Sequence, residues 1–287
     1  MTQSANPLRA FFRQPVIYLR LPSDGEFWPP GSLQMPPNRE LPVLPMTAMD
    51  EITYRTPDAL FNGDAVVTVI QSCVPNIKNA WLMPNCDFNA VLTAIRIASY
   101  GKNMPIATQC PKCNNENEHE LDLQDVMSQI AMGDYTHTVK HGDLEIFLQP
   151  MSYQTQTEIN LLQFEQQRVL GMLPNAELSD EEKTVKLNQA VKNLTNITVK
   201  AIQCSIQSIR TPQALVTEPE YILDFLLNCD RELFNAVKNH LISLRASDEF
   251  RPVVLQCTEC SNQYEQRFTL DTASFFESAS WPLMQKK

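Results

Sequence analysis

Hydrophobic residues recur at helical spacing in some segments of the chain and alternate with polar residues in others, so both helices and strands are predicted. The strongest helical pattern runs from Asp87, a candidate N-cap, to Tyr100, with Val91, Leu92 and Ile95 on one face. Four further helices are expected in the second half of the chain, each behind a capping residue or a proline. They are Ser152–Leu170, a stretch from Ser179 with a break near Asn193–Thr198, Tyr221–Cys229 and Asp230–Leu244.

Shorter elements are expected before residue 80. Two strands are predicted at Val16–Arg20 and at Leu41–Met46, and the two prolines of the second place it at a sheet edge. Helix starts are expected at the variant capping box of Thr47 with Asp50, at the pair Thr56-Pro57, and at Asp64–Cys73.

Alternating segments that are typical of β-hairpins lie on both sides of the later helices. Met104–Gln109 and Glu116–Leu123 flank one pair of cysteines, and Pro252–Leu270 surrounds a second pair. Between them, Thr136–Lys140 and Leu144–Gln149 flank a Gly-Asp turn.

The order of these elements predicts an α+β fold in which a helical insertion separates the two cysteine-bearing hairpins. Residues 1–46 are expected to form an arm with edge strands, and residues 47–150 an α/β part with the first hairpin. Residues 151–246 are expected to form the helical insertion, and residues 247–287 the second hairpin and a tail. An insertion of this size is consistent with ordinary domain lengths.

Two cysteine pairs share one spacing and one context. Cys110 and Cys113 belong to Gln-Cys-Pro-Lys-Cys-Asn-Asn, while Cys257 and Cys260 belong to Gln-Cys-Thr-Glu-Cys-Ser-Asn. Two C-x-x-C turns between strands are typical of a zinc ribbon, in which four thiolates surround one ion tetrahedrally. A closed shell of this kind has no open position for water, so we expect Zn²⁺ with a structural role.

Other interpretations of the cysteines remain open at this stage. The same shell could hold iron, or the motif could be a vestigial ribbon or a redox pair. The 143 residues between Cys113 and Cys257 favour an insertion whose two ends emerge together, because closing a free loop of that length costs about 4–5 kcal/mol plus a constant. The remaining cysteines have no paired spacing and are expected in the core: Cys73, Cys86, Cys204 and Cys229.

No catalytic or cofactor-binding residue is assigned. His137 and His141 are four residues apart, but their segment is predicted as a strand and turn rather than a metal-binding helix. His119 lies in the first cysteine hairpin and could serve as a ligand only if a cysteine were absent, but the two hairpins together supply all four cysteines. The acidic run Asp180–Glu182 suits the start of a helix, where it complements the helix dipole. No nucleophile elbow or phosphate-binding loop occurs, so a non-enzymatic protein is expected.

Composition narrows the class of protein further. The chain has 287 residues, 43% of them hydrophobic and 20% charged, which is typical of a folded protein. Its formal net charge of −10 repels nucleic-acid phosphates, and few Lys or Arg residues follow either cysteine pair. No apolar run is long enough to span a membrane, and Met1–Arg13 lacks the pattern of a secretory signal, so the cysteines are expected to be reduced.

Several strings in one order resemble the T4-type baseplate protein family of contractile-tailed bacteriophages, whose members are described as baseplate hub subunits or hub assembly proteins. The resemblance covers about residues 16–125. The strings are Leu21–Trp28, Leu41–Val43, Pro45–Glu51, Thr56–Gly63, Ile70–Pro75, Ala94–Gly101 and Cys110–Cys113.

The resemblance implies a structural or assembly role at the hub, with other baseplate proteins as partners and the virion as location after assembly in the host cytoplasm. An oligomer within the hub is compatible with it. Proline-rich N-terminal segments suit an arm laid on a neighbour, with Phe11, Phe12, Phe27 and Trp28 as candidate anchors. Two alternatives are a zinc-ribbon regulator associated with nucleic acid and a hydrolase with a dispersed site.

Overall fold

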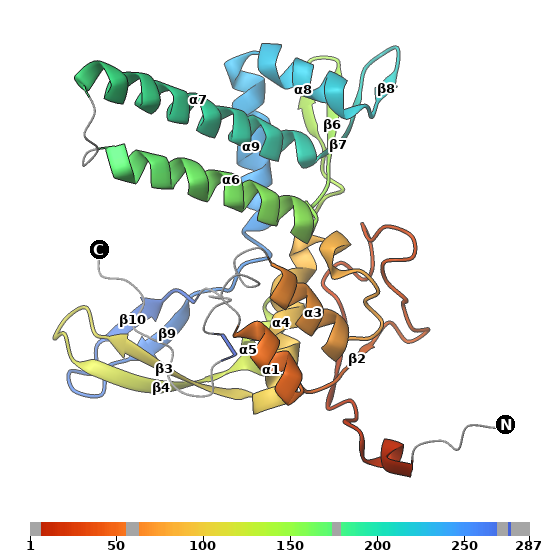
Figure 1. Ribbon diagram of the computed structural model, residues 1–287, viewed down its shortest axis with the longest axis vertical. Coiled ribbons are helices and arrows are strands. Elements are labelled where there is room, and N and C mark those ends of the chain that lie inside the picture. Colours follow the sequence, from red (N-terminus) through yellow and green to blue (C-terminus); the bar gives the residue numbers. More distant parts are fainter. Residues whose placement is uncertain (1–6, 56–62, 174–178, 269–274, 277–287) are drawn as a thin grey trace. The chain divides into compact units, whose positions relative to one another are not determined.

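The chain divides into two compact units, which are described separately. The computed structural model describes residues 7–55, 63–173, 179–268 and 275–276 (Figure 1). Unit 1 is assembled from residues 1–80, 87–131 and 249–287, and unit 2 from residues 81–86 and 132–248. The chain is mixed α and β, as the sequence predicts. The expected helix start at Thr56-Pro57 lies outside the described residues.

Unit 1 combines short helices with three two-stranded antiparallel sheets. Strand β1 (Ile17–Leu19) pairs with β2 (Leu41–Val43), β3 (Asn103–Gln109) with β4 (Glu116–Asp122), and β9 (Val253–Gln256) with β10 (Gln263–Gln266). The helical elements of this unit are η1 (Pro7–Phe11), α1 (Ala48–Tyr54), α3 (Asp64–Cys73), most of α4 (Asn85–Tyr100) and α5 (Leu123–Ser128).

The hydrophobic core of unit 1 includes the apolar faces of α3 and α4. Val66, Ile70, Leu92 and Ile95 are completely buried, at the helical spacing that the sequence shows. Helix α1 begins at the predicted capping box, because Thr47 accepts the amide N–H of Asp50 while the Asp50 carboxylate accepts that of Thr47. Local sequence is sufficient to start this helix.

The far C-terminal part of the chain also belongs to this core. Phe275 and Phe276 are buried, and the ring of Phe276 meets that of Tyr54 edge to face at 4.6 Å. The Arg96 guanidinium donates to the carbonyl of Phe275 at 2.6 Å and lies over its ring. Burial lowers the pKa of Arg96. Contacts across about 180 positions of sequence therefore complete unit 1.

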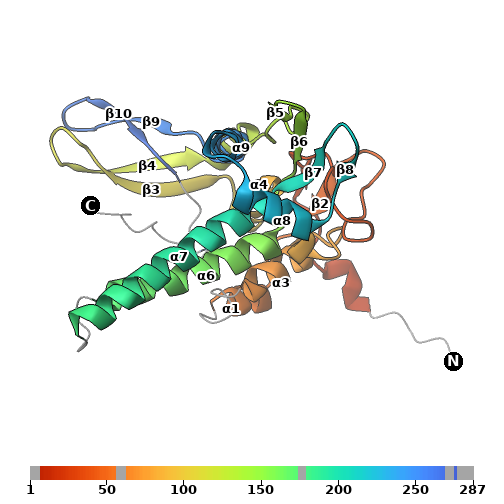
Figure 2. The same ribbon diagram turned by 90° about the horizontal axis from the view of Figure 1, so that it is seen from above.

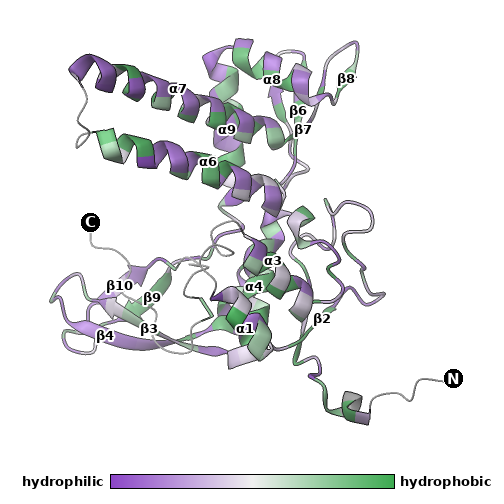
Figure 3. Cartoon of the chain, in the orientation of Figure 1, coloured by the Kyte–Doolittle hydropathy of each residue, from purple (hydrophilic) through white to green (hydrophobic). Residues whose placement is uncertain are grey.

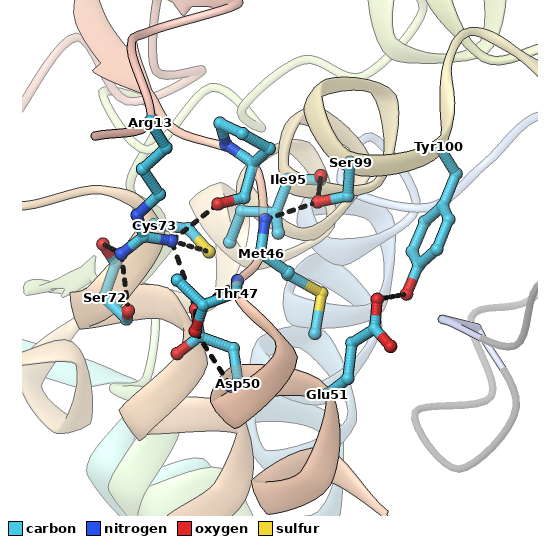
Figure 4. A network of polar contacts seen from close by, with 11 residues as sticks. Arg13, Met46, Thr47, Asp50, Glu51, Ser72, Cys73, Ile95, Ser99 and Tyr100 are labelled. Atoms are coloured by element: carbon cyan, nitrogen blue, oxygen red, sulfur yellow. Dashed lines mark hydrogen bonds and ion pairs between the residues drawn. The ribbon is translucent and has the colours of Figure 1, made fainter. Parts of the chain in front are cut away.

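A polar network anchors the N-terminal segment at Arg13 (Figure 4). Its guanidinium donates to the Asp50 carboxylate at 3.1 Å, to the Pro45 carbonyl at 2.5 Å, and to the carbonyl and hydroxyl of Ser72, both at 2.8 Å. Burial would raise the pKa of Asp50, but hydrogen bonds from Thr47 and Ser72 and the charge of Arg13 hold that pKa below its ordinary value. One side chain thus joins the segment to α1 and α3.

Asp87 has a different role from the predicted one. Helix α4 begins at Asn85, so Asp87 lies in the first turn and is not the N-cap. Its carboxylate is fully buried and accepts the Ser23 amide at 2.8 Å, the Ser23 hydroxyl at 2.5 Å and the Trp28 indole N–H at 2.7 Å. Burial raises its pKa, and these three donors oppose that effect. Trp28 is therefore held within its own unit.

The described residues of unit 2 form a four-stranded sheet and several helices. The sheet has the antiparallel order β5 (Val139–His141), β6 (Leu144–Leu148), β7 (Ile206–Arg210) and β8 (Leu215–Val216). Helices α6 (Tyr153–Met172) and α7 (Asp180–Cys204) run side by side in both views (Figures 1 and 2). The remaining elements are η2 (Ala80–Leu82), α8 (Pro219–Asn228) and α9 (Arg231–Arg245).

Capping residues start the helices of unit 2 where the sequence predicts them. Ser152 caps α6, the Ser179–Glu182 capping box starts α7, and Asp230 caps α9. The predicted break near Asn193–Thr198 is wrong, because α7 is continuous. The Asn193 amide donates to Gln166 of α6 at 3.0 Å, and Thr198 bonds the carbonyl of Leu194. Packing and these hydrogen bonds outweigh the weak helix propensity of that stretch.

The domain boundaries inferred from sequence remain a prediction. The structure groups residues 132–248 in unit 2, so the β5–β6 hairpin belongs with the helices assigned to residues 151–246. None of the helices in the described part of the chain is long and apolar enough to cross a membrane.

The Asp87 contacts generate a prediction about unit 1. Asp87→Ala leaves three donors without their acceptor in a buried site, so the free energy of unfolding should fall by about 3 kcal/mol. Denaturant unfolding monitored by tryptophan fluorescence measures this change. The matched control is Asp125→Ala, which removes an exposed carboxylate of the same unit and should have an effect within about 0.5 kcal/mol. Equal effects of the two variants would contradict the role given to Asp87.

Candidate metal centre

Two hairpins of unit 1 bring the four predicted cysteines together. Cys110 and Cys113 lie in the turn between β3 and β4, and Cys257 and Cys260 in the turn between β9 and β10. The four Sγ atoms all lie within 4.8 Å of one another. The sulfurs of Cys113 and Cys257 are 3.5 Å apart, and those of Cys110 and Cys260 are 3.7 Å apart. A tetrahedral site with metal–sulfur bonds near 2.3 Å requires sulfur separations of about 3.8 Å, so this arrangement can hold a metal ion.

Each turn is closed by the same pair of backbone hydrogen bonds. In the first, Cys110 N–H donates to Asn115 O and Asn114 N–H donates to Cys110 O, both at 2.9 Å. The second turn repeats these bonds at the equivalent positions, from Cys257 to Asn262 at 2.9 Å and from Ser261 to Cys257 at 3.0 Å. The two turns are therefore local copies of one another.

A left-handed residue follows the second cysteine of each pair. Asn114 has φ of 57° and Ser261 has φ of 54°. Asparagine tolerates this conformation better than most residues, while serine adopts it at a cost. Side-chain amides support both turns, because Gln109 donates to Asn114 O at 3.1 Å and Gln256 donates to Ser261 O at 3.4 Å. The glutamines that precede the two motifs thus have the same structural role.

Backbone N–H groups donate hydrogen bonds to the first sulfur of each pair. The N–H groups of Cys260 and Glu259 lower the pKa of the Cys257 thiol to about 6, against the opposing effect of burial. Burial would raise the pKa of Cys110, but the N–H groups of Cys113 and Lys112 outweigh it and the pKa is lowered. Both first cysteines are thus prepared to be thiolates, the form that binds metal ions.

The second cysteine of the first turn lies close to the other thiols. The Asn115 N–H acts to lower the pKa of Cys113, but the neighbouring thiols, Cys260 foremost, raise it to about 12. Sulfurs this close repel each other when all are ionised. A positive ion between the sulfurs would offset this repulsion.

Two buried polar side chains connect the hairpins. The side-chain Oδ1 of Asn117 accepts hydrogen bonds from the backbone amide and from the hydroxyl of Thr258, both at 2.9 Å. The Tyr264 hydroxyl lies 2.6 Å from the Thr108 hydroxyl and 3.4 Å from His119 Nε2. Tyr264 also packs against Cys110 and Cys257. These contacts join the hairpins through protein groups.

Asn117 and Tyr264 occupy equivalent positions, each seven residues after the first cysteine of its hairpin. Neither residue is predicted from the sequence, although the same distance from the first cysteine is a signal that could have identified both. Their hydrogen-bond partners differ. Thr258 offers an amide N–H to Asn117, but its counterpart Pro111 has no N–H, so a bonded amide at position 264 would lack that donor. Tyr264 instead fills the space and bonds Thr108.

The four cysteines differ in their exposure to solvent. Cys110 and Cys257 are buried, Cys260 is half-buried and Cys113 is exposed. Four protein ligands leave no position for a substrate or an activated water, so the arrangement suits a structural role.

The surface beside the centre is acidic. Strand β4 exposes Glu116, Glu118 and Glu120 in alternation, opposite Gln109, Ala107 and Pro105 of β3. The strand is strongly hydrophilic (Figure 3). Carboxylates in a row repel phosphates, so this face does not favour nucleic acid.

The other cysteines predicted from the sequence, and the two histidines four residues apart, do not belong to the four-cysteine group. Cys73 and Cys86 are buried, while Cys204 and Cys229 are only half-buried. Burial raises the pKa of Cys73 to about 12, so this thiol is unreactive. His137 is exposed and pairs with Asp134, and His141 lies 3.4 Å from Asp230. The structure does not bring these residues into the four-cysteine group.

The Asn117 contacts generate a prediction about metal binding. Asn117→Ala removes the hydrogen bonds that position the second turn, so Co²⁺ affinity should fall about tenfold, as for other residues that orient ligands. Titration of the thiolate–Co²⁺ absorption band measures the affinity. Asn103→Ala, at the far end of the same hairpin, serves as the control and should bind like the parent. Unchanged affinity in Asn117→Ala would show that the hairpins do not depend on this contact.

Comparison with known proteins adds evidence from the whole sequence. The model of the family described as T4 bacteriophage base plate protein matches residues 44–277, most of the chain. Searches of the curated proteins and of the solved structures found no match. The matched region begins before α1 and extends past both cysteine hairpins, so it includes units 1 and 2 alike. This chain therefore belongs to the T4 bacteriophage base plate protein family.

Proposed function

We propose that this phage baseplate protein is a subunit or assembly factor of the baseplate hub, that it acts through protein–protein contacts, and that Zn²⁺ at Cys110, Cys113, Cys257 and Cys260 stabilises unit 1. The observation that carries the metal proposal is the meeting of two C-x-x-C turns whose sulfurs lie at tetrahedral spacing. The family supports the baseplate role.

Zinc accounts for the site better than the alternatives. A C-x-x-C pair repeated in two hairpins, with both first sulfurs receiving amide N–H groups, is typical of structural zinc. Structural Zn²⁺ contributes roughly 10–16 kcal/mol in small peptides, which exceeds the cost of bringing together hairpins that are far apart in the chain. Iron in the same shell is the competing assignment, and metal analysis distinguishes the two.

Two exposed apolar surfaces support a role in protein contacts. Before the Arg13 anchor, Leu8, Phe11 and Phe12 are 62%, 85% and 54% exposed. We infer that residues 7–12 form the arm that reaches a neighbouring baseplate protein, and that Trp28 serves its own unit instead. Helices α6 and α7 also carry exposed apolar side chains: Leu162, Phe164, Val169, Met172, Val185, Leu187 and Val191.

The proposed location is the virion, after assembly in the host cytoplasm, with other baseplate and hub proteins as partners. No catalytic role is proposed. The nucleic-acid alternative loses support from the acidic row on β4, because the ribbon face that would meet phosphates carries carboxylates.

The zinc proposal predicts the behaviour of a ligand variant. Cys257→Ser should lose the bound metal and lower the melting temperature of unit 1 by more than about 10 °C, because a structural metal contributes folding free energy. Metal content by plasma mass spectrometry and calorimetry measure both effects. Cys229→Ser, a half-buried thiol outside the cluster, should keep one zinc per chain. A zinc-loaded Cys257→Ser protein would refute the site.

The arm predicts a change in assembly without a change in folding. The double variant Phe11→Ser with Phe12→Ser should reduce incorporation into particles at least about tenfold, since buried aromatic anchors dominate interface energies. Its melting temperature should stay within about 2 °C of the parent, because both side chains are exposed. Complementation of infected cells followed by quantitative mass spectrometry of particles measures incorporation. Parental levels of the variant would eliminate the arm.

The hub assignment is tested by quantitative mass spectrometry of purified virions and of hub intermediates. A fixed ratio to known hub proteins in virions indicates a permanent subunit. Presence in intermediates alone indicates an assembly factor. Absence from both would refute the hub proposal.

A further inference from the structure

The cysteine centre pairs a more exposed sulfur with a buried one across the two hairpins. Exposed Cys113 lies 3.5 Å from buried Cys257, and half-buried Cys260 lies 3.7 Å from buried Cys110. Each pair joins the second cysteine of one hairpin to the first cysteine of the other. A disulfide requires a sulfur separation near 2.0 Å, so the two pairs must close by about 1.5 and about 1.7 Å.

The polypeptide around these sulfurs is held by contacts that do not involve a metal ion. Backbone hydrogen bonds fix each C-x-x-C turn, and the Asn117–Thr258 and Thr108–Tyr264 contacts hold the two hairpins against each other. The facing sulfurs should therefore stay opposed when the ion departs. A disulfide between the hairpins needs only movement of the cysteine side chains. A disulfide within one turn must also fit the turn backbone, which hydrogen bonds already fix.

We infer from this geometry that the centre is also a site of oxidative modification, at which peroxide expels the metal ion and joins the hairpins through Cys113–Cys257 and Cys110–Cys260 disulfides. The inference depends on the four-cysteine geometry and not on the hub assignment. Its consequence is that a covalent link between hairpins replaces the metal link when the protein meets an oxidant.

The chemistry balances with peroxide as the oxidant. The exposed Cys113 thiolate attacks hydrogen peroxide, takes up one oxygen as a sulfenic acid and releases hydroxide. The Cys257 thiolate then attacks the sulfenic sulfur, forms the S–S bond and expels a second hydroxide. Cys260 and Cys110 repeat the sequence. In total, four metal-bound thiolates and two peroxide molecules give two disulfides, four hydroxide ions and the free divalent ion.

Proteolysis can separate all four cysteines, which makes the linkages directly readable. Trypsin cuts after Lys112, between Cys110 and Cys113. Glutamyl endopeptidase cuts after Glu259, between Cys257 and Cys260. After both enzymes, each of the three ways of pairing four cysteines gives linked peptides of different mass.

The experiment treats the full-length protein with graded hydrogen peroxide, blocks free thiols, and maps the linked peptides under non-reducing conditions. We expect the Cys113–Cys257 and Cys110–Cys260 peptides to dominate, with a mass loss of about 4 Da per chain for two disulfides. Metal should be released in proportion, one ion for each two disulfides, as measured with a chromogenic chelator. The Cys229→Ser protein, which lacks a half-buried thiol outside the centre, should give the same two linkages.

Two results would overturn the inference. One is a predominance of either other pairing, Cys110–Cys113 with Cys257–Cys260 or Cys110–Cys257 with Cys113–Cys260. The other is progression of the four thiols to sulfinic or sulfonic acids without disulfides. The metal content of the untreated protein is recorded in parallel. The expulsion of the ion rests on the zinc proposal, so a metal-free protein that forms the cross-hairpin linkages would refute the zinc proposal and that step, and would leave the pairing of the sulfurs standing. A zinc protein with linkages inside the turns would refute this inference alone.

Discussion

The contact between two hairpins that are 143 residues apart in the chain is the constraint on which unit 1 depends. Neither hairpin can complete a four-sulfur shell, and a two-stranded hairpin by itself is only marginally stable in water. Together they share Tyr264 and the Asn117–Thr258 contact, and their sulfurs reach tetrahedral spacing. The metal proposed here would strengthen a contact that the polypeptide already makes.

The rest of unit 1 is held by the same kind of long-range polar contact. Asp87 holds the loop at Ser23 and Trp28, Arg13 joins the N-terminal segment to α1 and α3, and Arg96 bonds the carbonyl of Phe275. In each case a buried or half-buried charge collects donors or acceptors from distant segments. Burying a charge is costly unless its partners are supplied, so these groups determine which segments must meet.

In this baseplate protein, the residues that stabilise unit 1 differ from the exposed apolar residues that we propose contact other proteins. The core of unit 1 is buried, while the aromatic residues before Arg13 and several apolar residues on α6 and α7 are exposed. Arg13 marks the end of the arm that we propose, because its hydrogen bonds fix the segment beside it without using the aromatic side chains. An anchored arm loses less entropy on docking than a free one.

The sequence by itself determined the features that depend on neighbours in the chain. The capping boxes at Thr47 and Ser179, the cap at Asp230, the cysteine hairpins and the family all follow from local patterns, because a cap or a turn needs only a few consecutive residues. Only the tertiary structure decided the role of Asp87, the continuity of α7 and the contacts that Asn117 and Tyr264 make between the two hairpins. Each depends on a partner between 27 and 156 positions away, namely Ser23 for Asp87, Gln166 for Asn193, Thr258 for Asn117 and Thr108 for Tyr264. A local pattern carries no information about such a partner, because folding alone brings the two together.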